Sequence, residues 1–129
     1  MADKNTILAW AYHWEKTAPD KVFATQPMGG GSVKDWTWKQ MMQEARRMAT
    51  HLKSLDLPDK SQISICSKNC VYWVMADLAI WMAGHVSVPI FPTLTAETVR
   101  YILENSESKL LFVGKLDAAG VARADEQHL

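Results

Sequence analysis

The sequence predicts an α/β protein in which a partial parallel sheet with flanking helices (β-α-β-α-β) is preceded by a helix and a β-hairpin. Three observations support this class. After residue 58, short and nearly wholly apolar runs, typical of strands covered on both faces, alternate with helical patterns. Before it, two amphipathic patterns flank a glycine-rich turn. The chain has 129 residues, 48% of them hydrophobic, which suffices for one domain with a core.

We divide the chain into three parts on these patterns. Residues 1–57 form the helix, hairpin and helix, residues 58–116 form the β-α-β-α-β units, and residues 117–129 form a polar tail. The charge is balanced, with 14 basic and 14 acidic residues and no basic stripe. Since nucleic-acid binding depends on neutralising phosphates, a nucleic-acid partner is not expected.

The first predicted helix begins at Asn5 or Thr6, either of which can cap it, and ends at 17–20. Its apolar residues recur at helical spacing: Ile7, Leu8, Trp10, Ala11 and Trp14. We interpret the aromatic cluster of Trp10, Tyr12 and Trp14 as core rather than as a platform for a ligand.

A β-hairpin follows, with strands at 22–25 and 34–37 and a turn at 28–32. The turn contains Gly29, Gly30 and Gly31, which also suggests a phosphate-binding loop. Such a loop lies between a strand and a helix and ends in a lysine and a serine or threonine. Because no Lys-Ser/Thr pair follows the glycines, we favour the turn.

Thr37 and Gln40 have the spacing of a capping box, which predicts a helix that ends near Leu57. The apolar stripe of this helix consists of Met41, Ala45, Met48, Leu52 and Leu55.

The β-α-β-α-β part has predicted strands at 63–66, 86–90 and 110–113, with helices at 71–83 and from 95 onwards. Asn69 and Thr95 are the expected helix caps, and Gly84 ends the first helix. Pro89 has no N–H to donate and is expected at a strand end or a bulge.

The predicted helix at 71–83 is apolar nearly all round, so it must be buried on most sides. It is too short to span a bilayer, and Asp77 would oppose insertion. For Asp77 a hydrogen-bond partner or contact with water is favoured over catalysis. Since the first five residues are polar and no apolar signal follows, a cytoplasmic location is expected.

Few residues suggest chemistry. Residues 67–69 follow a strand and precede a helix, where anions can bind. The segment Ser67–Asn69 lacks the glycines that close approach of a phosphate requires, so we favour simple capping. Cys66 and Cys70 are read as small buried hydrophobes. The histidines are scattered and do not predict a metal site: His13, His51, His85 and His128.

Several short motifs occur in a fixed order along the chain. They are Ile63-Ser64-Ile65-Cys66-Ser67, Asn69, Trp73, Ala76-Asp77-Leu78-Ala79, Ala83-Gly84, Val88-Pro89 and Pro92-Thr93. Together they resemble the N-terminal portion of AMP-forming acyl-CoA synthetases, members of the adenylate-forming superfamily. The stretches 89–93 and 98–103 look most like the long-chain fatty acid branch. The resemblance covers roughly residues 5–116, and it implies that the chain is a fragment of the N-terminal domain of that fold.

The resemblance implies ATP-dependent activation of a fatty acid. The carboxylate attacks the α-phosphate, which gives an acyl-adenylate and pyrophosphate, and the CoA thiol then displaces AMP. The longer enzyme would use ATP, Mg and CoA, and could lie peripherally at a membrane. The family's catalytic motifs do not occur in this chain: the loop ending P-K-G, the Y-G-x-T-E segment, the ribose-binding aspartate and the C-terminal lysine.

No catalytic, cofactor-binding or metal-binding residue is therefore assigned, and the fragment alone is expected to be inactive and to bind none of these cofactors. The loop Phe91–Thr93 matches one that approaches CoA in relatives, but it is bulkier here and is not assigned. The alternative is a self-contained flavodoxin-like binding module. It is disfavoured because no Ser/Thr/Gly-rich loop follows Cys66.

The strand at 110–113 is entirely apolar and is expected at or near an open sheet edge. Exposed apolar surface of this kind predicts self-association.

Overall fold

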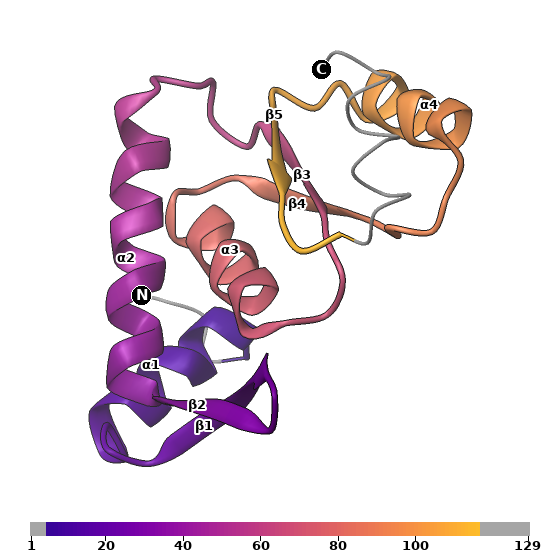
Figure 1. Ribbon diagram of the computed structural model, residues 1–129. Coiled ribbons are helices and arrows are strands. Elements are labelled where there is room, and N and C mark those ends of the chain that lie inside the picture. Colours follow the sequence, from indigo (N-terminus) through magenta and orange to yellow (C-terminus); the bar gives the residue numbers. More distant parts are fainter. Residues whose placement is uncertain (1–4, 117–129) are drawn as a thin grey trace.

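The computed structural model describes residues 5–116 (Figure 1). Its helices and strands, in chain order, are α1 (Ile7–Thr17), β1 (Val22–Gly29), β2 (Ser32–Thr37), α2 (Trp38–Ser54), β3 (Gln62–Cys66), α3 (Val71–Met82), β4 (Val86–Ile90), α4 (Ala96–Ser106) and β5 (Leu110–Val113). The predicted polar tail at 117–129, and His128 within it, lie outside the described residues.

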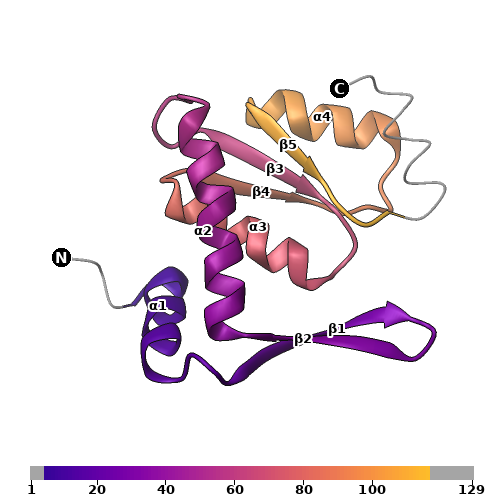
Figure 2. The same ribbon diagram turned by 60° about the vertical axis from the view of Figure 1, so that its left-hand side comes forward.

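The predicted partial parallel sheet with flanking helices is confirmed. Its strand order is β4-β3-β5, and β3 pairs in parallel with both neighbours. Helices α2 and α3 pack against the face that carries Ile63 and Ile65, while α4 lies on the opposite side (Figure 2). The two crossovers run in opposite directions across the sheet, so connections of the same hand place α3 and α4 on opposite faces.

Two adjoining clusters form the core, and α3 belongs to both. One joins α3 to α1, the hairpin and the start of α2. The other joins α3 to the end of α2 and to β3. The largest fully buried apolar side chains are Met41, Met42, Leu52, Ile63, Ile65, Met75 and Ile80. The predicted burial of the apolar helix is therefore confirmed.

Local signals correctly predict most helix ends. The capping box of Thr37 and Gln40 is present, and Thr6 and Thr95 cap α1 and α4. Gly84, with φ +81°, lies just after α3. The stripe of α2 needs correction at its end, because Leu55 is 41% exposed. The helix stops at Ser54, so Leu55 no longer follows the buried face.

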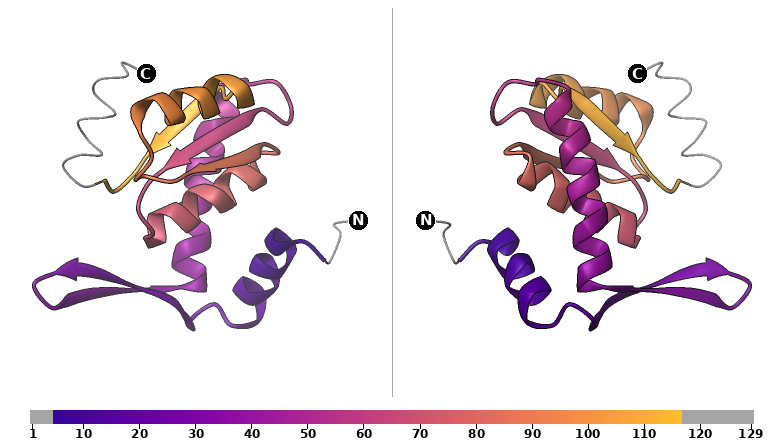
Figure 3. Two further views of the ribbon diagram at one scale, coloured as in Figure 1. Left: turned by 90° about the vertical axis from the view of Figure 1, so that its right-hand side faces the viewer. Right: turned by 90° about the vertical axis from the view of Figure 1, so that its left-hand side faces the viewer.

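The hairpin extends further than the sequence predicts, although its turn is confirmed. The strands run to Gly29 and from Ser32, which leaves Gly30 and Gly31 as the connection. Both have positive φ, +61° and +80°. A two-residue turn of this kind matches the twist of the flanking strands and favours glycine. Figure 3 shows the hairpin extending away from the parallel sheet.

The predicted core position of the α1 aromatic residues is wrong. Trp10, Tyr12 and Trp14 are 51%, 40% and 40% exposed, and Ile7 is exposed as well. The helix packs on the rest of the chain through a narrow strip in which Ala11 is buried. A narrow strip suffices because α1 covers only the first half of α2 and part of α3 (Figure 2).

An ion pair also attaches α1 to α2. The two guanidinium nitrogens of Arg46 contact the two carboxylate oxygens of Glu15. The Glu15 carboxylate raises the pKa of Arg46 by accepting these hydrogen bonds. Among residues 5–116 no helix is long and apolar enough to cross a membrane.

Candidate functional site

The carboxyl ends of β3 and β5 lie side by side, at the edge where open parallel sheets bind ligands. Backbone hydrogen bonds join the two segments beyond the ladder. The Lys68 N–H donates to the Lys115 carbonyl (2.7 Å), and the Gly114 N–H donates to the Cys66 carbonyl (3.0 Å). We call this hydrogen-bonded edge, residues 66–68 and 113–115, the corner of the sheet, and it is the candidate site.

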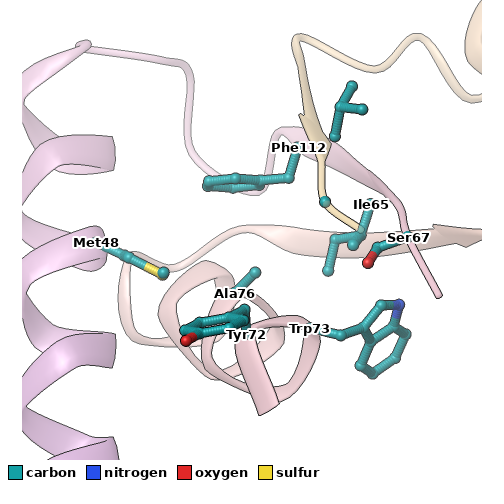
Figure 4. A pocket seen from close by; sticks show the side chains of 9 residues that line it. Met48, Ile65, Ser67, Tyr72, Trp73, Ala76 and Phe112 are labelled. Atoms are coloured by element: carbon teal, nitrogen blue, oxygen red, sulfur yellow. The ribbon is translucent and has the colours of Figure 1, made fainter. Parts of the chain in front are cut away.

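A pocket of about 170 Å³ opens beside this corner, between the sheet and helices α2 and α3 (Figure 4). Most of its wall is apolar or aromatic: Met48, Ile65, Tyr72, Trp73, Ala76, Phe112, Val113 and Gly114. Ser67 contributes a hydroxyl. Its size and lining suit a small apolar group rather than a nucleotide.

The Ser67 hydroxyl is already used by the chain itself. It accepts from the Lys115 N–H (3.0 Å) and donates to the Lys68 carbonyl (2.8 Å). Gly114 packs directly on this side chain, since a Cβ built on Gly114 would lie 2.4 Å from Ser67 Oγ. Ser67 is therefore a structural linker between β3 and β5, and neither a cap nor an anion ligand.

The expected capping of α3 by Asn69 is wrong. The N-cap residue is Cys70, whose side chain makes no capping hydrogen bond. Instead, Gln26 of the hairpin accepts a hydrogen bond from the Val71 N–H through Oε1 (2.8 Å). A first-turn N–H that could have attracted an anion is therefore bonded within the protein.

The cysteines are half-buried rather than buried. The sulfur of Cys70 lies 3.9 Å from Ser67 Oγ. Their position at the end of β3 and the start of α3 places them near the corner, but outside the apolar wall of the pocket.

Asp77 of α3 is an ionisable group whose pKa the fold raises. Its Oδ1 and the Ser87 Oγ of β4 are both buried, and neither has a hydrogen-bond partner of good geometry among residues 5–116. Burial raises the pKa of Asp77 above its ordinary 3.8, and the nearby Ser87 hydroxyl offsets part of that rise. The two side chains are close, but they do not make a catalytic pair with any described base.

Replacing Asp77 by asparagine is expected to stabilise the protein at neutral pH. A carboxyl group whose pKa is raised on folding favours the folded state below its ordinary pKa, and this contribution is lost as the pH rises through the folded value. The gain should stay below about 1 kcal/mol, because the side chain is only half-buried. Urea unfolding at neutral pH and again below pH 3.8 measures it.

In that experiment the difference between Asp77→Asn and the wild type should vanish at the lower pH. Asp59→Asn, at an exposed loop position before β3, is the matched control and should change nothing at either pH. A destabilised Asp77→Asn at neutral pH would contradict the assignment, because it would mean that the charged form is held favourably.

The histidines are separate in space as well as in sequence. His13 lies on α1 between the rings of Trp10 and Trp14, and His51 is exposed on α2. His85 is buried, and its Nδ1 accepts from the Ser61 N–H (3.2 Å). Within the described residues, no three His, Cys, Asp or Glu side chains come together as a metal site.

The remaining candidate segments lie away from the corner. Gly29–Gly31 are at the tip of the hairpin, and a Cβ on any of the three would meet open space. These glycines join two antiparallel strands, whereas a phosphate-binding loop joins a strand to a helix. Phe91, after β4, is 75% exposed and does not line the corner pocket.

Two structural contacts near this edge of the sheet are not predictable from local sequence patterns. Gln26 accepts a hydrogen bond from Val71, 45 positions further along the chain. Gly114, after β5, packs against Ser67, after β3. The position of Gly114 directly after the apolar strand is the one sequence signal for its contact with Ser67, because a glycine in or beside a strand often marks a close approach of another part of the chain.

Comparison with known proteins gives consistent results. Residues 11–129 match the family described as AMP-binding enzyme. The long-chain-fatty-acid–CoA ligase FadD15 of Mycobacterium bovis is 31% identical over 112 residues, which cover 87% of this chain and 18% of that protein. Nonribosomal peptide synthetase 5 of Gibberella zeae is 30% identical over 96 residues, 74% of this chain and 1% of that protein.

Solved structures share the fold. The fatty acid AMP ligase from Legionella pneumophila matches with a TM-score of 0.74 at 18% identity, over 82% of this chain and 19% of that chain. CmiS6 matches with a TM-score of 0.76 at 22% identity, over 82% of this chain and 27% of that chain. The chain thus spans about a fifth of the length of the ligases it matches.

Proposed function

Because the chain belongs to the AMP-binding enzyme family, we propose that it forms the N-terminal part of an ATP-dependent ligase that activates a long-chain fatty acid and transfers it to CoA. The main support for this proposal is the match of residues 11–129 to the AMP-binding enzyme family. Long-chain-fatty-acid–CoA ligases are among the similar proteins, at about 30% identity. The peptide synthetases that match reach 30% identity over 74% of this chain or 25% identity over 86% of it, whereas FadD15 of M. bovis combines 31% identity with 87%, which supports the fatty acid branch.

At the edge of the sheet beside β3 and β5, the residues offer few free groups for ATP or its magnesium ion. At the carboxyl edge of the sheet, the Ser67 hydroxyl and the Val71 N–H are already bonded within the chain. The pocket there is small and apolar. We therefore propose that this chain supplies a scaffold, that it is inactive alone, and that groups elsewhere in the longer enzyme bind ATP, Mg and CoA.

A chimera tests the ligase assignment. In it, residues 5–116 replace the matching segment of FadD15 from M. bovis, and pyrophosphate release from ATP is measured with and without a long-chain fatty acid. We expect release that depends on the fatty acid, because the shared fold should support the rest of the enzyme. The same chimera with Leu52→Ala, which removes a buried core side chain, should release less pyrophosphate if the release depends on the folded segment. A chimera that folds but releases no pyrophosphate would contradict the proposal.

The inactivity of the separate chain needs its own assay. ATP–pyrophosphate exchange by the 129-residue protein with a fatty acid should not exceed the blank. Exchange above the blank would contradict the proposed inactivity but leave the ligase assignment intact. Calorimetric titration with FMN, AMP and CoA distinguishes the flavodoxin-like alternative, for which FMN alone would bind tightly.

We also propose that exposed apolar surface makes the isolated chain self-associate, and that the parent enzyme contacts membranes peripherally. Support for self-association comes from the large apolar side chains that are more than half exposed: Ile7, Trp10, Met28, Val33, Phe91, Tyr101 and Val113.

A further inference from the structure

We draw no further inference here: the strongest candidate, the apolar pocket between the corner of the sheet and helices α2 and α3, carries nothing, because no feature of residues 5–116 shows what covers it.

Discussion

Replacing Leu52 by alanine is expected to lower the free energy of unfolding by about 2–5 kcal/mol, because the truncation leaves a cavity in the core. Leu52 is fully buried on α2, in the cluster that also contains Ile63 of β3 and Ile80 of α3. Its side chain therefore helps to join three elements. Urea-induced unfolding followed by circular dichroism measures the change.

Leu55→Ala is the matched control, on the next turn of the same chain segment. The sequence places both leucines on one apolar stripe, but Leu55 is 41% exposed just after the helix ends. Its truncation should cost less than about 1 kcal/mol. Equal losses for the two variants would mean that α2 continues beyond Ser54 and buries Leu55.

Gly114→Ala should cost about 1–3 kcal/mol, the usual range for adding a methyl group where there is no room. The new Cβ would lie 2.4 Å from Oγ and 2.6 Å from Cβ of Ser67. Elsewhere the same substitution stabilises proteins by about 0.4–1 kcal/mol, because it restricts the unfolded chain. The sign of the change in urea unfolding therefore reports on the close approach of β5 and Ser67.

A double-mutant cycle assigns that cost to its cause. Ser67→Gly removes both atoms that the alanine would meet. In this background Gly114→Ala should be neutral or stabilising, although Ser67→Gly itself loses the hydrogen bond with the Lys115 N–H. Additive losses in the double variant would show that the penalty at Gly114 arises from the backbone and not from Ser67.

Elements of the fold that depend on neighbouring residues are predictable from this sequence. The capping box at Thr37, the cap at Thr95 and the glycine after α3 mark helix ends within one turn of the chain. Apolar runs likewise indicate the three parallel strands. The order β4-β3-β5 did not follow from them, because it depends on how the crossovers pack across the sheet.

The sequence-based predictions that the structure contradicts, for the α3 cap and for the α1 aromatic residues, have a common physical origin. Both depend on contacts between residues that lie far apart in the sequence. Asn69 is a good capping residue locally, yet Gln26 from the hairpin bonds the first turn of α3. For the α1 aromatic residues, the pattern correctly predicts a helix but cannot show how much of it the neighbouring elements cover. Trp10 is therefore half exposed although its neighbour Ala11 is buried.

The contact between Gln26 and α3 limits how this chain can be divided. The hairpin satisfies the start of a helix that belongs to the parallel sheet, and the same helix supplies Val71 and Met75 to the cluster beneath α1. Residues 5–57 and 58–116 thus share one interior and should melt in a single transition. Cut between them, neither piece would retain a closed core, so the smallest autonomous folding unit includes both.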